Sequence, residues 1–439
     1  MNKKGKTPAI SWQAMFFLYV LFAMNANGRE IINRLSPYII DTFNVTAAQV
    51  GLIGTASAIG MVIGCIPISR WVEKGQHGAG MKKRVSFVAL GYLIFMALCG
   101  ISPVCCTFGA LVIFQGFRGL FSSPGENGEV NAVVEWWPKE QNGLALGFHH
   151  TAYPWGTLVG GLLVTALLKV VGDDNWQLAF LIFPVLGVLI IIGYNKFSTK
   201  ERYDKLEKDI EAAGMTPTLK SVGGTEKAEA LESIPVLTVL KEQKVWTSAL
   251  MGFCCQFSYI GLMFWMPLYL SYVAGYSYSS VASLSVLYAI TGGLGQIFWG
   301  SFSDKRGVKK TLIICFIWLA ISFYLMKFIS YGLVWIIVLQ LLIGCCSNAV
   351  YPVMYKRVQD AVPDNANVTA TSIITTGIFI GAACATYFTG LIIELGGGYE
   401  SISGYNTGLY CMAGLMVLAL VLLLLSEAAA KKKNNKEEV

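Results

Sequence analysis

Long apolar segments follow one another along almost the whole chain, and this pattern constrains the fold more than any other feature. Hydrophobic residues make up 55% of the 439 residues and charged residues only 13%. A helix needs about 20 apolar residues to cross a bilayer, and twelve segments have about this length. They lie near residues 11–40, 47–70, 85–107, 108–137, 143–171, 176–195, 245–273, 278–302, 311–328, 332–356, 366–395 and 403–426. We therefore predict an all-α membrane protein with twelve transmembrane helices.

Lys and Arg residues gather in every second connection between these segments. Of the 33 Lys and Arg residues, 28 lie before the first segment, in the even-numbered connections or in the tail. The opposite connections hold only Lys169 and Lys327, at their edges. Positive charge is typical of cytoplasmic loops. We therefore expect both termini to be cytoplasmic, in a multi-pass protein of a bacterial inner membrane.

A polar segment, residues 196–244, divides the chain into two halves. It holds nine basic and nine acidic residues with Gly and Pro breaks, a composition typical of a linker. A weak helix is expected from Ser198 to Ala213. The predicted parts are an N-terminal six-helix half at 1–195, a cytoplasmic linker at 196–244, a C-terminal six-helix half at 245–426 and a cytoplasmic tail at 427–439.

The two halves repeat one pattern. Pro37 begins a Pro-Tyr-Ile-Ile run at the end of the first segment, and Pro267 begins a Pro-Leu-Tyr-Leu run at the end of the seventh. Glu73 follows Pro37 by 36 positions, and Asp304 follows Pro267 by 37. Such repetition predicts two equivalent bundles. Parallel six-helix halves are the arrangement of major facilitator transporters.

Two loop motifs resemble those of the major facilitator superfamily. The run Gly300-Ser-Phe-Ser-Asp-Lys-Arg-Gly-Val-Lys-Lys310 is similar to its loop motif, and Glu73-Lys74-Gly75 is similar to the first copy, with Glu in place of Asp. The resemblance implies charge pairs that a rocking protein makes in one state and breaks in another. The implied gating residues are Glu73, Lys74, Asp304 and Arg306.

Four further stretches are similar to the anion:cation symporter family, which takes up organic anions with protons. They are Gly28-Arg29 to Pro37-Tyr38-Ile39, Trp136-Trp137-Pro138 with Gln141-Asn142-Gly143, Trp265 to Leu270, and Val362-Pro363-Asp364. The resemblance implies that Arg29 binds the anion. The chain departs from the family at Gly28, where an acidic or tyrosine residue is frequent, and at Ser122 or Ser123, where a carboxylate is frequent.

Polar side chains also lie in the middle of the first apolar segment. Asn25, Arg29 and Asn33 fall on one helical face. Placing an arginine at this depth in a membrane costs free energy, so its presence indicates a function. We predict that this face lines a cavity. Glu30 and Arg34 lie four residues apart on a neighbouring face and could neutralise each other.

The fourth segment carries a second stripe of polar residues. Arg118, Ser122, Glu126 and Glu129 fall on one helical face at spacings of four, four and three. A carboxylate near an arginine gains a proton more readily once an anionic substrate occupies that arginine. We therefore predict that Arg29 binds the substrate carboxylate, that Arg118 assists it or is structural, and that Glu126, in preference to Glu129, takes the proton.

The helices of the second half offer mainly neutral polar groups. Gln256, Tyr259, Asn348 and Tyr351 are expected to hydrogen-bond uncharged parts of the solute. The segment 245–273 contains no arginine, which favours a carboxylate over a phosphate ester.

Other classes of function find little support in the sequence. The chain has no phosphate-binding glycine loop and no His/Cys metal motif, so we expect neither an enzyme nor a cofactor, metal or nucleic-acid partner. The eleven cysteines lie in apolar segments and are expected to be packing residues.

The predicted partners are a small organic anion, protons and the lipid bilayer, with the protein a monomer. Proton symport is the main hypothesis; anion exchange, drug efflux and a non-transporting membrane sensor are the alternatives.

Overall fold

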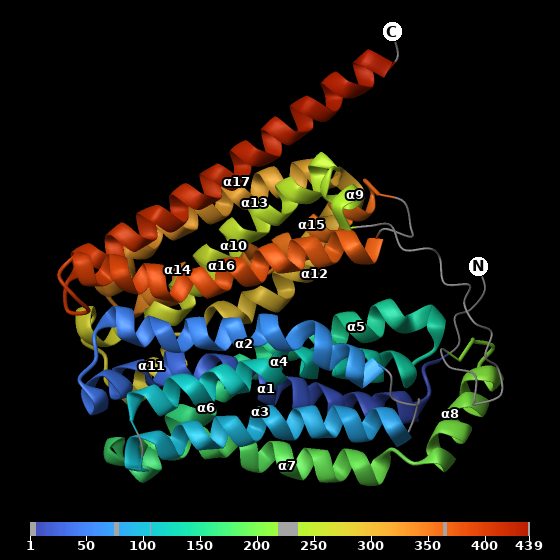
Figure 1. Ribbon diagram of the computed structural model, residues 1–439, viewed down its shortest axis with the longest axis horizontal. Coiled ribbons are helices and arrows are strands. Elements are labelled where there is room, and N and C mark those ends of the chain that lie inside the picture. The colour runs from blue at the N-terminus through green and yellow to red at the C-terminus, as the bar shows by residue number, and fades with distance from the viewer. Residues whose placement is uncertain (1–5, 74–78, 106, 218–235, 363–366, 438–439) are drawn as a thin grey trace. The chain divides into compact units, whose positions relative to one another are not determined.

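A computed structural model describes residues 6–73, 79–105, 107–217, 236–362 and 367–437, which are nearly all helical (Figure 1). The first helices are α1 (Ala9–Phe43), α2 (Ala47–Glu73), α3 (Ala79–Cys105), α4 (Phe108–Glu135), η1 (Lys139–Gln141), α5 (Asn142–His150), α6 (Ala152–Val171), η2 (Asp173–Leu178), α7 (Ala179–Phe197) and α8 (Lys200–Ala212). The later helices are α9 (Val236–Leu240), α10 (Gln243–Leu268), η3 (Tyr269–Val273), α11 (Tyr278–Leu284), α12 (Tyr288–Arg306), α13 (Val308–Leu325), η4 (Met326–Tyr331), α14 (Leu333–Ser347), α15 (Val350–Gln359), α16 (Asn367–Leu395) and α17 (Ile402–Glu437).

The helices confirm the predicted membrane fold. Eleven helical stretches in the described part of the chain are long and apolar enough to cross a membrane. The predicted fourth span, α4, is not one of the eleven; it carries Arg118, Glu126 and Glu129 within its 28 residues. The predicted fifth span is one of the eleven, Leu144–Val171, and is made of α5 and α6 with Thr151 between them. Pro154, which lacks a backbone N–H, thereby falls in the first turn of α6, where that donor is not needed.

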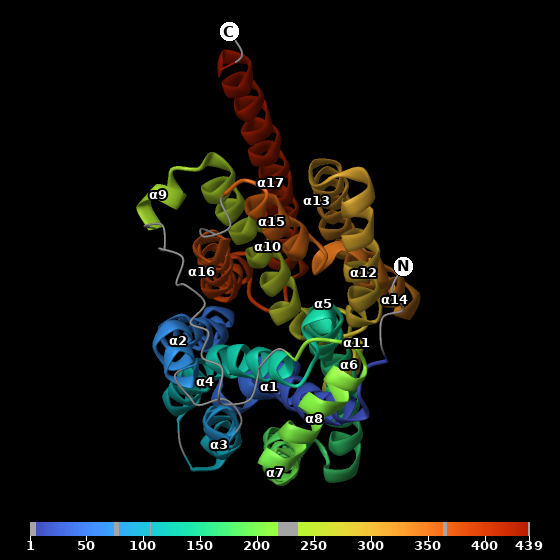
Figure 2. The same ribbon diagram turned by 90° about the vertical axis from the view of Figure 1, so that its right-hand side faces the viewer.

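The described chain forms two compact units. The first unit comprises Met1–Ile32 and Ile59–Lys227, with the beginning of α1, the end of α2 and α3 to α8. In it α3 packs against α4 and α7 (Figure 2). The indoles of Trp136 and Trp137, at the end of α4, are completely buried.

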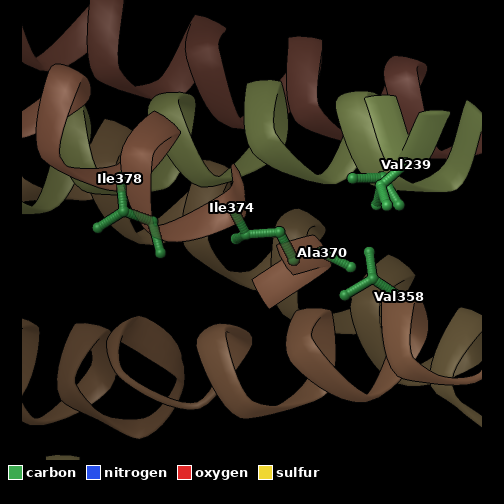
Figure 3. Packing of buried hydrophobic residues seen from close by; sticks show 6 residues of the cluster. Val239, Val358, Ala370, Ile374 and Ile378 are labelled. Carbon is green, nitrogen blue, oxygen red and sulfur yellow. The ribbon is translucent and has the colours of Figure 1, made fainter. Parts of the chain in front are cut away.

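The second unit comprises Asn33–Ala58 and Ala228–Val439. In it α10 packs along α16 and α17. A core cluster joins α9, α10, α15 and α16 (Figure 3) through Val239, Val245, Val358, Ala370, Ile374 and Ile378. Helix α17 continues without a break from the last span into residues 427–437 of the predicted tail (Figure 1).

Small residues bring α2 and α16 into close contact in the second unit. A Cβ on Gly51 would lie 2.6 Å from Thr386 O, and a Cβ on Gly390 would lie 2.8 Å from Ala47 O. Thr55 Oγ1 donates to Ala383 O at 2.9 Å and lies 3.0 Å from Thr386 Oγ1. We call this contact, formed by Ala47, Gly51, Thr55, Ala383, Thr386 and Gly390, the α2–α16 seam.

The first part of the predicted linker packs against the first unit. Its expected helix is confirmed as α8, and Tyr203 stacks on Trp136 with ring centroids 4.0 Å apart. The backbone N–H of Lys139 donates to Thr216 O at 2.9 Å, and the N–H of Thr216 donates to both carboxylate oxygens of Glu140 at 3.1 Å. This hydrogen bonding lowers the pKa of Glu140, whereas burial raises the pKa of Tyr203.

Candidate functional site

An ion pair joins α1 to α4 inside the first unit. Arg29 Nη2 lies 2.7 Å from Glu126 Oε2, and the two side chains are 15% and 29% exposed. Arg29 Nε also donates to Ser122 Oγ at 2.9 Å. The structure therefore brings the predicted anion-binding arginine together with the predicted proton-accepting glutamate, and leaves both side chains partly exposed.

Asn25 and Ser122 position this ion pair. Asn25 Nδ2 donates to Ser122 O at 2.8 Å, and Ser122 Oγ donates to Asn25 Oδ1 at 2.6 Å. Both side chains are completely buried. Ser122 stands at one of the two positions where the resembling family often has a carboxylate, and it contacts Arg29 while Glu126, one turn further along α4, supplies the negative charge.

Arg118 is placed differently from Arg29. Its side chain is only 1% exposed, and its Nε donates to Gln115 Oε1 within α4 at 2.6 Å. A Cβ on Gly28 would lie 3.6 Å from Arg118 Nη1, so the guanidinium packs over this glycine. Of the two roles predicted for Arg118, this position favours the structural one.

Tyr153 on α6 is a neighbour of the site that the sequence did not single out. Its hydroxyl donates to Glu30 Oε1 at 2.9 Å, and the Arg29 guanidinium carbon lies 6.0 Å from the centre of its ring. The only sequence signal was its place in the Tyr153-Pro154-Trp155 run of the fifth apolar segment. Aromatic residues in such runs are common, so only the packing of α6 against α1 identifies it.

Glu129 is completely buried and does not join the ion pair. The hydroxyl oxygen of Tyr92 on α3 lies 3.3 Å from Glu129 Oε1. Tyr92 is a second residue that sequence analysis missed, because nothing in the third segment distinguishes it from an ordinary core tyrosine.

The predicted neutral residues lie in the second unit. Tyr351 donates to Gln256 Oε1 at 2.5 Å, which joins α15 to α10. Tyr259 is 4% exposed and Asn348 is 8% exposed. Asn33 also belongs to the second unit, where its carbonyl accepts a bond from Ser36 Oγ at 2.7 Å.

The predicted gating residues lie at helix ends. Glu73 is the last residue of α2, and Asp304 and Arg306 end α12. Lys74 lies outside the described residues. Nowhere in the described ranges do three or more His, Cys, Asp or Glu side chains form a group that could hold a metal ion.

Membrane-spanning helices around a partly exposed, charged interior site are typical of secondary transporters. The family model of the Major Facilitator Superfamily matches residues 15–287 and 275–439. This chain therefore belongs to the Major Facilitator Superfamily: it is an integral multi-pass membrane transporter, not an enzyme.

Individual relatives agree with this assignment. The chain is 24% identical to the hexuronate transporter of Bacillus subtilis, over 96% of each chain. It is 22% identical to the phosphoglycerate transporter protein of Salmonella typhimurium, over 86% of this chain and 81% of the relative. A solved structure of a bacterial homolog to the human lysosomal transporter Spinster, in an inward-facing and occupied conformation, has the same fold, with a TM-score of 0.72, 17% identity, and coverage of 96% of this chain and 98% of that one.

Proposed function

We propose that this transporter carries a small organic anion with a carboxylate, such as a sugar acid or a hydroxy acid, together with protons by alternating access. The observation that supports this most directly is the partly exposed pair of Arg29 with Glu126. An arginine that already holds one carboxylate has the geometry to hold another. The names of the relatives, a hexuronate transporter and a phosphoglycerate transporter, support an anionic substrate.

Coupling follows from competition for Arg29. When a substrate carboxylate replaces Glu126 on the guanidinium, Glu126 loses its cation in a partly desolvated place. A carboxylate there is stabilised by taking a proton. The hydrogen bonds between Asn25 on α1 and Ser122 on α4 do not involve Glu126. They therefore hold Ser122, and with it Arg29, in position while the partner of Arg29 changes. Substrate and proton are then bound together.

The number of accessible cations favours a substrate with one carboxylate. Arg118 is packed over Gly28, and α10 contains no arginine. The Arg29 guanidinium carries one positive charge, whereas a phosphate ester with two negative charges would need a second cation beside it.

We propose that Asn33, Gln256, Tyr259, Asn348 and Tyr351 supply hydrogen bonds to neutral parts of the solute, and that Glu73, Lys74, Asp304 and Arg306 take part in gating.

Uptake into proteoliposomes tests this proposal. Radiolabelled D-glucuronate, D-gluconate, lactate, succinate and benzoate are compared with and without an inward proton gradient. We expect Arg29→Lys to lower uptake at least about tenfold, because lysine cannot replace the forked guanidinium contact. We expect Glu126→Gln to keep counterflow exchange but lose the response to the gradient. Arg202→Lys and Glu201→Gln, both exposed on α8, are the matched controls.

Two results would change the assignment. Uptake that ignores the gradient but rises with internal substrate makes the protein an organic-anion exchanger and removes the role of Glu126. Unchanged uptake in Arg29→Lys contradicts the binding site itself.

A further inference from the structure

Glu129 lies one helical turn from Glu126, yet its surroundings differ. Its side chain is 0% exposed, and within the described chain its Oε2 is buried without a hydrogen-bond partner. The charged groups that act on it are Glu126, which repels a second negative charge, and Arg29, which is already paired with Glu126. An ionised carboxylate without a cation of its own is very costly in such a place.

Hydrogen-bond counting at Tyr92 is consistent with a protonated Glu129. The hydroxyl oxygen of Tyr92 lies 3.2 Å from Leu21 O and 3.3 Å from Glu129 Oε1. A hydroxyl has one hydrogen to donate but can also accept. If Tyr92 donates to Leu21, only a protonated Glu129 completes the chain, by donating its own hydrogen to Tyr92. If Glu129 is ionised, the tyrosine hydrogen can turn to the carboxylate instead, so Tyr92 is a partner for both states of the acid.

Packing holds Tyr92 beside the ion-pair site. The ring is 1% exposed, and a Cβ on Gly125 would lie 3.0 Å from Tyr92 Cε1 and 3.5 Å from Asn25 Nδ2. Gly125 therefore lies between Tyr92 and Asn25. Glu129, beside Tyr92, is therefore connected to the Arg29 site through the turn of α4 that contains Gly125.

We infer that Glu129 is a second proton-carrying residue, which is protonated while Arg29 and Glu126 are paired and which supplies the proton that Glu126 takes when substrate binds. This inference rests on the proposed function. In the transfer, the O–H bond of Glu129 breaks and an O–H bond forms on Glu126. Glu129 is then ionised, and the Tyr92 hydroxyl turns its hydrogen from Leu21 O to the Glu129 carboxylate. The proton leaves Glu126 on the side of substrate release, Arg29 pairs with Glu126 again, and Glu129 is protonated again before the next substrate binds. One proton moves in each cycle, and it loads before the substrate.

Two measurements on purified protein test this inference. Infrared spectra of the substrate-free protein are compared between the unmodified chain, Glu129→Gln, Glu126→Gln and Glu135→Gln, where Glu135 is another buried glutamate on α4. We expect a protonated-carboxyl band that only Glu129→Gln removes. Proteoliposome assays with D-glucuronate, or with the best acid of the panel, then compare accumulation with counterflow. Glutamine keeps a neutral donor for Tyr92 but has no proton to give, so accumulation should fall at least about tenfold while counterflow persists.

Each contrary outcome has a definite meaning. If Glu129→Gln removes no band, Glu129 is ionised and the inference is wrong. If the band is lost but gradient-driven accumulation persists, Glu129 is a fixed structural acid and the transfer is wrong. If the unmodified protein shows no gradient-driven uptake, the proposed symport and the transfer both fail, and the band still decides the protonation of Glu129 by itself. A loss of accumulation in Glu135→Gln to the same degree would also contradict a specific role for Glu129.

Discussion

Gly160 on α6 leaves the space that the amide of Asn27 on α1 occupies. A Cβ on Gly160 would lie 1.7 Å from Asn27 Oδ1, and the amide is held by bonds from its Nδ2 to Ala23 O at 2.8 Å and to Gly156 O at 2.9 Å. We predict that Gly160→Ala destabilises the protein by about 1–3 kcal/mol through overpacking. Thermal unfolding in detergent measures this change. Gly147→Ala, where a Cβ meets nothing within 4 Å, is the control and should be neutral or slightly stabilising; equal melting of the two variants would refute the packing argument.

The Glu140 carboxylate in η1 helps to hold the start of the linker, and its charge depends on pH. The bonds from Thr216 lower the folded-state pKa of Glu140, so its ionised form stabilises the packing of residues 200–217 on η1. This contribution is complete above the ordinary pKa of a glutamate and is lost as pH falls through the lowered folded-state value. We predict faster hydrogen exchange at the Thr216 amide in acid, relative to its intrinsic rate, and in Glu140→Gln at neutral pH. An exchange rate that Glu140→Gln leaves unchanged would show that the carboxylate does not hold this segment.

The proposed alternating access requires contacts that form and break during each cycle. The α2–α16 seam is a candidate, because it joins a helix of each predicted six-helix half through close backbone contacts and the Thr55 hydroxyl. Thr55 and Thr386, with Oγ1 atoms 3.0 Å apart, are close enough for cysteines at these positions to form a disulfide. We predict that oxidised Thr55→Cys/Thr386→Cys loses transport and regains it on reduction, whereas each single variant is insensitive to oxidant. Transport by the cross-linked protein would mean that the seam stays closed throughout the cycle.

The membrane fold could be predicted from the sequence because bilayer thickness sets the length of each apolar segment. The same reasoning singled out Arg29, Glu126 and Glu129, since charges inside such segments are rare and costly. It did not predict the packing of α8, because local pattern does not reveal which surface a helix contacts. Tyr92 and Tyr153 were missed for the same reason.

The pattern of residues along the chain was enough to predict the helices, their polar faces and the three charged residues of the site. Which carboxylate contacts the arginine depends on how the helices pack against one another. Helical spacing places Glu126 and Glu129 on one stripe of α4. The sequence favoured Glu126, but the spacing alone does not show which of the two contacts Arg29. The packing of α1 and α3 against that stripe does: Glu126 pairs with Arg29 at 2.7 Å, while Glu129 is buried against Tyr92. Side chains one turn apart therefore have opposite surroundings, because each faces a different neighbouring helix.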